Sequence, residues 1–314
     1  MKKKKLPKLI VILGPTASGK TSLATKLAKE PALRKIEGFS EVEIVSADSR
    51  QIYKEMDIGT AKPTKKELKA VPHHLIDVIP PDKEFNVALY KRKALSVIKD
   101  IQKRGKIPFL VGGTGLYIQA IVDNLVFPKI APKKELRNKL ESKDKKELFL
   151  IYRKLDPQGA QLIDKENKRR LVRAIEVCKT TGKPFWQQRK KGKPLFDVLQ
   201  IGIELSKEKL KKRIAKRTNK MMGAGLEKET KKLAKKYRSS PLLQTIGYQE
   251  CLALRSLGER GVVEGKSRKI KENIKLHTLQ FAKRQMTWFK RDKRIHWIKN
   301  YSQAKNLIKT FLNT

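Results

Sequence analysis

The chain has 314 residues, of which 75 are Lys or Arg and 31 are Asp or Glu, so its formal net charge is +44. A chain of this length can bury a substantial core, as one large domain with an insertion or as two modest domains. The basic excess extends along the whole sequence, which favours a polyanionic partner, although a generally lysine-rich organism would give the same composition. No segment approaches the roughly 20 consecutive apolar residues of a membrane-spanning helix, which excludes a helical membrane protein.

The two cysteines, Cys178 and Cys251, are far apart and have no paired spacing. This pattern indicates neither a disulfide framework nor a structural zinc site, so we expect a reducing, cytoplasmic setting. The basic start of the chain precedes only a short apolar run, Leu9–Leu13, which is too short for the core of a secretory signal.

Short apolar runs bounded by turn residues predict strands. In chain order they are Leu9–Leu13, Val42–Ala47, Leu75–Ile79, Ile107–Val111, Leu199–Leu205 and Ile295–Ile298. Helical periodicity separates several of them, as at Val87–Arg104, and returns at Ile270–Phe289. This alternation predicts an α/β fold with a parallel sheet.

Between Pro128 and Pro194 the apolar residues recur at helical spacing without strand patterns. We therefore expect an all-α insertion over residues 129–196 within a discontinuous core domain, residues 1–128 and 197–314. The predicted architecture is a P-loop kinase-like parallel sheet flanked by helices.

The first predicted strand leads into Gly14-Pro15-Thr16-Ala17-Ser18-Gly19-Lys20-Thr21, which has both the spacing and the context of a phosphate-binding P-loop. Its glycines allow the backbone to approach an anion, and free amides at the start of the following helix point toward that anion. Lys20 can neutralise the phosphate charge and the Thr21 hydroxyl can hold Mg²⁺. The motif predicts a polyphosphate site for ATP or another phosphorylated donor.

Two further strand ends carry polar groups, and ligands of such sheets collect beyond the carboxyl ends of the strands. Asp48 follows the second strand and could take a proton from a nucleophile, hold Mg²⁺ through water, or only cap a following helix. Thr114 follows Gly112-Gly113, where glycines permit close backbone approach, although a simple tight turn would also explain them.

A nucleotide hydrolase needs an apolar strand that ends in a metal-holding Asp, and the best candidate, Leu75-Ile76-Asp77, is weak. The sequence thus favours a transferase in which the P-loop holds a phosphorylated donor and another strand end presents the acceptor. His73 and His74 have no further ligand at metal-binding spacing, so we expect them to form hydrogen bonds at the start of a strand.

Several motifs occur in an order that resembles the tRNA dimethylallyltransferases. They include, besides the P-loop, the segments 46–53, 56–63, 72–77, 112–117, 170–177, 221–229, 246–250 and 283–289. The resemblance covers the chain from about Leu9 to Ile298. It implies transfer of a dimethylallyl group from dimethylallyl diphosphate to N6 of the tRNA adenosine immediately 3′ of the anticodon.

The resemblance also implies roles for individual residues. Asp48 matches the family's catalytic Asp, Arg217 matches its diphosphate-binding Arg, and Thr114 matches a residue at the acceptor side of the channel. The diphosphate would be held by the P-loop, Lys20 and Mg²⁺ on Thr21. The target base has to leave its stack, as in other base-modifying enzymes.

The implied partners are dimethylallyl diphosphate and a tRNA anticodon stem-loop, with no membrane, and we expect a monomer. The implied tRNA contacts are Asp48, Ser49, Arg50, Gln51, Thr114, Arg137, Arg169, Arg170, Leu171, Val172, Arg173, Thr245, Ile246, Gly247, Tyr248, Gln249 and Glu250. The match at Arg137 needs a one-residue shift in spacing, and the arginines near residue 170 could equally form a solvated helix face. Trp288 and Phe289 fit a helix core better than a base-stacking platform.

Three alternatives stay open from the sequence. An adenylate isopentenyltransferase would prenylate a free nucleotide, and a small-molecule P-loop kinase would use ATP as donor. A non-catalytic RNA-binding protein would not need Lys20, Asp48 and Arg217 together.

Overall fold

The computed structural model describes residues 5–36, 41–128, 130–131, 133–188, 190–238, 240–253 and 263–314. These residues contain a parallel sheet of six strands in the order β3-β2-β4-β1-β5-β6. The strands are β1 (Lys8–Leu13), β2 (Val42–Ser46), β3 (His73–His74), β4 (Ile107–Gly112), β5 (Asp197–Ile203) and β6 (Ile295–Ile298). The predicted α/β class with a parallel sheet is confirmed.

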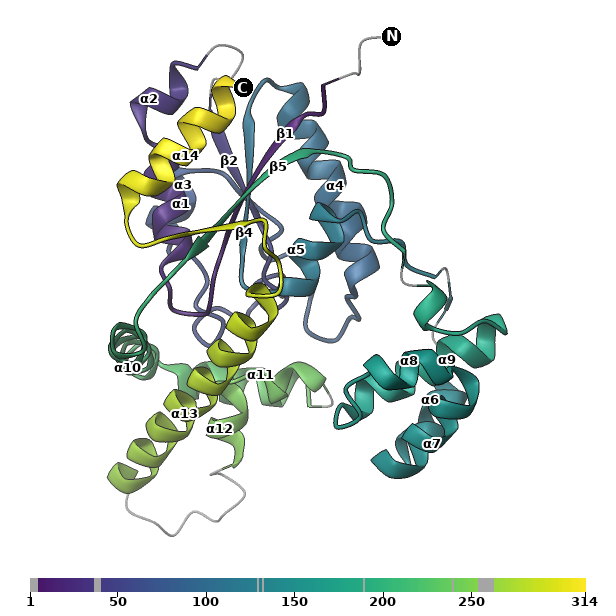
Figure 1. The fold of residues 1–314 in the computed structure, drawn as a ribbon. Coiled ribbons are helices and arrows are strands. Elements are labelled where there is room, and N and C mark those ends of the chain that lie inside the picture. Colours follow the sequence, from purple (N-terminus) through teal and green to yellow (C-terminus); the bar gives the residue numbers. More distant parts are fainter. Residues whose placement is uncertain are drawn as a thin grey trace. The chain divides into compact units, whose positions relative to one another are not determined.

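Helices cover both faces of this sheet because β1 is apolar on both sides. Successive side chains of a strand point to opposite faces, so Leu9 and Val11 enter one core and Ile10 and Ile12 the other. Figure 1 shows α1 (Lys20–Ala28) and α14 (Tyr301–Asn313) on one face and α4 (Val87–Lys103) and α5 (Gly115–Val122) on the other.

The helix α4 illustrates how the sequence sets these elements. The Asn86 side chain accepts hydrogen bonds from the Ala88 and Leu89 amides at 3.0 Å and thereby begins the helix. Tyr90, Ala94 and Ile98 then form one buried stripe.

The other helices of the part of the chain that contains the sheet are α2 (Pro31–Arg34), α3 (Lys65–Ala70), α10 (Lys207–Gly223), α11 (Leu226–Lys236), α12 (Tyr248–Ala253) and α13 (Val263–Phe289), with a short 3₁₀ helix at Pro241–Gln244. Figure 1 shows α10 to α13 grouped beyond the carboxyl ends of the strands. Phe289 is buried and Trp288 packs against Gly115, which confirms their prediction as core residues.

The expected strand at Leu75–Ile79 is wrong. Pairing with β2 ends after His74, because Leu75 and Asp77 adopt left-handed backbone conformations with φ of 62° and 57°. The segment turns instead toward the loop after β2, where the Val78 amide donates to Ile52 O at 2.8 Å. The two histidines form hydrogen bonds as expected, His73 with Val71 O and His74 with Glu43, each at 2.7 Å.

The chain divides into two compact units, Met1–Val122 with Leu195–Thr314, and Asp123–Pro194. The second unit contains α6 (Lys134–Glu141), α7 (Lys145–Leu155), α8 (Pro157–Leu162), α9 (Lys168–Thr181) and a 3₁₀ helix at Trp186–Gln188. It begins earlier than the expected residue 129 because its entering and leaving segments pair with each other. Leu125 forms an antiparallel bridge with Lys191, and Asn124 Nδ2 donates to Lys193 O at 2.9 Å.

The core of the helical unit encloses the carboxylate of Glu176, whose side chain is fully buried. It accepts hydrogen bonds from Arg137 Nε at 2.8 Å, Arg173 Nη1 at 2.6 Å and the Lys133 amide at 2.9 Å. Burial alone would raise the pKa of Glu176, but these hydrogen bonds outweigh it and hold the pKa below its usual value of 4.5.

We expect Glu176→Ala to lower the free energy of unfolding by about 2 to 3 kcal/mol, because it removes a buried carboxylate that accepts hydrogen bonds from two arginines. The cost stays below that of a fully buried pair, since each arginine side chain is about one third exposed. The contribution is present above pH 4.5 and is lost as the pH falls through the lower folded pKa. Urea unfolding at pH 7 and at pH 3 measures it. An equal difference between parent and variant at both pH values would contradict this role.

Candidate functional site

The P-loop connects β1 to α1 and takes its shape from glycine. Gly19 lies in the left-handed region with φ of 91° and stands directly before α1. This backbone angle favours glycine, and a Cβ atom at this position would also approach Arg213 Nη1 to 3.1 Å. The loop therefore presents the start of α1, where backbone amides favour an anion.

Lys20 is the first residue of α1, and its ammonium donates to Pro15 O at 2.7 Å. Burial lowers the pKa of Lys20 to about 8, Asp48 opposes this shift and Arg217 adds to it. The cation thus lacks sufficient negative charge around it, and a bound phosphate would supply that charge.

Helix α10 adds two arginines to the P-loop. Arg213 Nη1 donates to Ser18 O at 2.6 Å, and Arg217 Nη1 donates to Thr16 Oγ1 at 2.8 Å. The Nε atom of Arg217 and the hydroxyl of Ser18 are buried and have no hydrogen-bond partner within the described ranges. Unsatisfied donors of this kind beside a P-loop suit an anionic ligand. Burial also lowers the pKa of Arg217.

Sequence reasoning named Arg217 and missed Arg213. The signal was available, because residues four apart lie on the same face of a helix. Once Arg217 is assigned to the P-loop, the same face of α10 brings Arg213 there too.

The ends of β2 and β4 lie against each other because β4 ends in glycine. A Cβ atom on Gly112 would lie 2.2 Å from Ala47 O. The Thr114 amide donates to Ala47 O at 3.1 Å, and the Thr114 hydroxyl accepts from the Ser49 amide at 3.0 Å. These contacts hold Thr114 beside the residue that follows Asp48.

Asp48 does not cap a helix, because the next helix of the described chain after β2 is α3, which begins at Lys65. Its side chain caps a turn instead. Its Oδ1 atom accepts from the Arg50 amide at 2.8 Å and from the Gln51 amide at 3.4 Å. Both hydrogen bonds that this carboxylate accepts from described residues end on Oδ1. Asp48 is partly exposed and can therefore meet a ligand.

These residues meet in one cavity of about 430 Å³. Its lining combines Thr16 of the P-loop, Asp48 and Thr114 of the strand ends, and Arg217 of α10. The other lining residues come from the loop after β2, from residues 244–249, and from α10 and α13: Ser49, Arg50, Gly59, Thr60, Ala61, Met221, Gln244, Thr245, Ile246, Gln249, Ile274, Thr278, Phe281, Arg284 and Gln285. One hollow thus joins cations that suit a phosphate to a carboxylate that can accept a proton.

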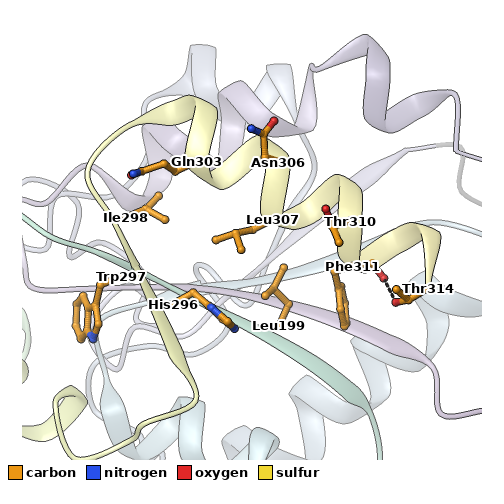
Figure 2. A pocket seen from close by; sticks show the side chains of 10 residues that line it. All are labelled: Leu199, His296, Trp297, Ile298, Gln303, Asn306, Leu307, Thr310, Phe311 and Thr314. Atoms are coloured by element: carbon orange, nitrogen blue, oxygen red, sulfur yellow. Dashed lines mark hydrogen bonds between the residues drawn. The ribbon is translucent and has the colours of Figure 1, made fainter.

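A larger hollow of about 720 Å³ lies between the sheet edge at β6 and α14 (Figure 2). Its lining is mostly apolar and neutral, with His296 as the one histidine and no Asp, Glu, Lys or Arg side chain. The hydrogen bond drawn in Figure 2 joins the Thr314 hydroxyl to the Phe311 carbonyl at the end of α14. This hollow has no Lys or Arg for phosphate binding, whereas the smaller cavity combines arginines with a carboxylate, so the smaller cavity is the candidate site.

The model of the family described as "IPP transferase" matches residues 51–292, and that of "isopentenyl transferase" matches residues 7–78. The chain belongs to the IPP transferase family. It is 42% identical over 302 residues to a tRNA dimethylallyltransferase of Carboxydothermus hydrogenoformans, covering 92% of this chain and 91% of that one. It is 40% identical to a protein of the same name from Picosynechococcus, covering 96% and 98%.

Two solved structures extend these similarities to three dimensions. The tRNA isopentenylpyrophosphate transferase of Bacillus halodurans has a TM-score of 0.68 and 34% identity, covering 98% of this chain and 97% of that one. A eukaryotic dimethylallyltransferase, described as acting on tRNA, has a TM-score of 0.75 and 28% identity, covering 97% and 77%.

Among the tRNA contacts that the family resemblance implies, five line the cavity of this transferase besides Asp48 and Thr114: Ser49, Arg50, Thr245, Ile246 and Gln249. Gln51 does not line it, and its Nε2 atom donates to Ala61 O at 3.1 Å and to Thr60 O at 3.4 Å. Gln51 therefore shapes the loop that forms one wall.

Gly247, Tyr248 and Glu250 have structural roles, and their contact with RNA stays a prediction. The Tyr248 ring is fully buried and its hydroxyl donates to Glu229 at 2.6 Å. Glu250 is buried and accepts from the Gly247 amide and from His277 Nδ1, each at 2.6 Å. These bonds hold the start of α12, which follows Thr245 and Ile246 in the chain.

The expected tRNA contacts in the helical unit likewise include both buried and exposed residues. Leu171 and Val172 are buried in its core, because a helix in a small bundle must use its apolar face for packing, and their contact with RNA stays a prediction. Arg137 and Arg173 hold Glu176. Arg169 is exposed at the first turn of α9 and Arg170 is partly exposed beside it.

Within the described ranges no helix is long and apolar enough to cross a membrane.

Proposed function

We propose that this chain transfers a dimethylallyl group from dimethylallyl diphosphate to N6 of the adenosine immediately 3′ of the anticodon in tRNA, with release of diphosphate. The observation that carries the proposal is the single cavity in which Arg217 and the P-loop residue Thr16 face Asp48 and Thr114. Membership of the IPP transferase family and the names of its relatives support it.

The proposed donor site is the P-loop with Lys20, Arg213 and Arg217. In the reaction the bond between the allylic carbon and the diphosphate oxygen breaks, and negative charge accumulates on the departing diphosphate. Cations held in a partly desolvated site stabilise that charge more strongly than the charge of the intact donor. The unpaired Nε atom of Arg217 is one donor available for it.

The proposed acceptor site lies at Asp48 and Thr114. An exocyclic adenine amine is a weak nucleophile, so a carboxylate that accepts its proton assists formation of the new bond between N6 and the allylic carbon. The proton goes from N6 to Asp48 and the bonding electrons of the broken bond leave with diphosphate. The base must leave its stack to reach the cavity, at an estimated few kcal/mol.

The proposal includes Mg²⁺, with the hydroxyl of Thr21 as the protein ligand. Thr21 is partly exposed in the first turn of α1, next to Lys20. In the part of the chain that the structure describes, no three His, Cys, Asp or Glu side chains are placed to hold a metal ion together. The ion would therefore take most ligands from diphosphate and water, as Mg²⁺ commonly does, and would add positive charge beside the leaving group.

We also propose that the protein works as a cytoplasmic monomer. Cys178 and Cys251 are buried free thiols, and burial raises the pKa of Cys251 to about 11. Inert thiols of this kind suit a reducing compartment.

The choice of acceptor tests the function. We expect transfer of labelled dimethylallyl to an anticodon stem-loop with adenosine 3′ of the anticodon, and at least 100-fold lower kcat/KM for AMP. Phosphates of the stem can provide the binding energy that extrudes the base, whereas AMP has no remote contacts. Comparable kcat/KM values would favour an adenylate isopentenyltransferase, and a γ-phosphate transferred from ATP would favour a kinase.

Binding of tRNA should weaken steeply with salt, because Lys and Arg contacts release counterions from the phosphates. We expect Arg169→Gln to lower the slope of log affinity against log salt by about 1. The matched control is Lys309→Gln, an exposed lysine on α14, which should leave the slope unchanged. A flat plot for the parent protein would show that its charge serves another partner.

A further inference from the structure

One buried glutamine of α13 joins two loops of the cavity. The Gln285 side chain is 8% exposed and uses both ends of its amide. Its Oε1 atom accepts from the Thr16 amide of the P-loop at 2.7 Å. Its Nε2 atom donates to Gly113 O, in the loop after β4, also at 2.7 Å.

The space around this amide is closed. A Cβ atom on Gly113 would lie 2.5 Å from Gln285 Nε2 and 3.5 Å from Gly14 O. The loop after β4 therefore touches both the glutamine and the P-loop, and a side chain at position 113 would separate them. A neutral group with one donor and one acceptor satisfies a backbone amide and a backbone carbonyl together, which a carboxylate or an apolar side chain cannot do.

The two loops carry opposite halves of the site. Thr16 Oγ1 accepts from Arg217, which belongs to the donor half. Thr114 follows Gly113 and holds Ser49, the neighbour of Asp48, in the acceptor half. A continuous series of contacts thus runs from Arg217 through Gln285 to the residues beside Asp48.

We infer that Gln285 is a positioning residue that sets the spacing between the diphosphate site and the acceptor loop, an inference that rests on the proposed transfer reaction. Transfer requires N6, the allylic carbon and the departing oxygen to be aligned, with the reacting atoms about 3 to 3.5 Å apart. A shift between the two loops lowers the rate even when each substrate still binds its own half.

The first test is Gln285→Met, which keeps the length of the side chain and removes both hydrogen bonds. We expect the single-turnover rate at saturating substrates to fall at least 10-fold, with affinities for inorganic diphosphate and for the stem-loop within threefold of the parent. Gln102→Met is the matched control: Gln102 also lies on a helix, and its Nε2 atom donates to a strand carbonyl, Lys8 O, at 2.9 Å. It should leave the rate unchanged.

A rate for Gln285→Met within twofold of the parent would overturn the inference. So would a parallel loss of diphosphate affinity, which would mean that Gln285 only maintains the P-loop. A parent protein that prenylates no stem-loop would overturn the proposed function itself, and that result is visible before any variant is made.

The second test is Gln285→Glu. Its ionised carboxylate can accept from Thr16 but opposes Gly113 O, whereas its neutral acid form can donate to Gly113 O. We therefore expect the rate of the variant relative to the parent to rise at least threefold as the pH falls and the carboxyl becomes protonated. The relative rate of Gln285→Met should stay constant. The charged groups of the site also titrate, and the neutral variant Gln285→Met controls for their own pH dependence: Lys20, Asp48, Arg50, Arg217 and Arg284. A pH-independent ratio for Gln285→Glu would contradict the inference.

The third test uses Gly113→Ala, whose methyl group displaces Gln285 Nε2. We expect a loss of rate similar to that of Gln285→Met. The double variant that combines Gly113→Ala with Gln285→Met should be no slower than the slower of these two single variants, because both changes remove the same contact. Losses that multiply would show that the two positions act separately.

Discussion

The variant Lys20→Ala is expected to fold and to turn over about 10³-fold more slowly than the parent, on the scale of removing one preorganised charge stabiliser. Burial already lowers the pKa of Lys20 to about 8, so this cation lies where charge is weakly screened. The interaction of such a cation with the diphosphate strengthens as the diphosphate leaves. Loss of the cation therefore destabilises the transition state more than the bound donor.

Pre-steady-state transfer to a stem-loop measures this effect. Lys29→Ala is the matched control, since Lys29 is an exposed lysine at the end of the same helix. Because Lys20 is charged below its pKa, diphosphate affinity of the parent should also fall as the pH rises above about 8, and the variant should lose that dependence. Turnover of Lys20→Ala within threefold of the parent would remove the P-loop from the mechanism.

For Asp48→Asn we expect tRNA affinity close to that of the parent and a single-turnover rate lower by about 10²-fold or more, the usual scale for a positioned general base. The asparagine keeps an Oδ1 atom that can accept from the Arg50 and Gln51 amides, so the turn survives and only the basicity is lost.

The variant Asp48→Ala separates these two roles, because it removes the turn contacts as well. We expect it to bind tRNA more weakly than Asp48→Asn and to transfer no faster. If Asp48→Asn transfers at a normal rate but binds tRNA poorly, Asp48 positions the acceptor and another group takes the proton.

Local patterns predicted most of the sheet. The strand at Ile295–Ile298 has the predicted bounds, and the others that formed differ by one or two residues at their ends, because a buried strand needs a continuous apolar run. The prediction at Leu75–Ile79 failed because apolar composition does not reveal backbone conformation. Asp77 of this segment forms an ion pair with Lys62, which also pairs with Asp57. The conformation of the segment therefore depends on residues outside the apolar run.

The P-loop residues, Asp48 and Thr114 could be named from sequence because they are contiguous or follow strands, whereas Arg217 of α10 was named from the family resemblance. The partner of Arg137 and Arg173 could not, since the buried Glu176 looks like any other charged residue of a basic helix. Gln285 was also beyond reach, because Thr16 lies 269 residues earlier in the chain. Contacts of this range depend on the folded topology and leave no local pattern.

The most direct test of the central claim is nucleoside analysis after reaction of the full chain with labelled dimethylallyl diphosphate, Mg²⁺ and unmodified tRNA. We expect one labelled nucleoside, N6-dimethylallyladenosine, at the position 3′ of the anticodon, and one diphosphate released for each group transferred. Label that stays on the donor, or that enters free AMP while tRNA remains unmodified, would contradict it.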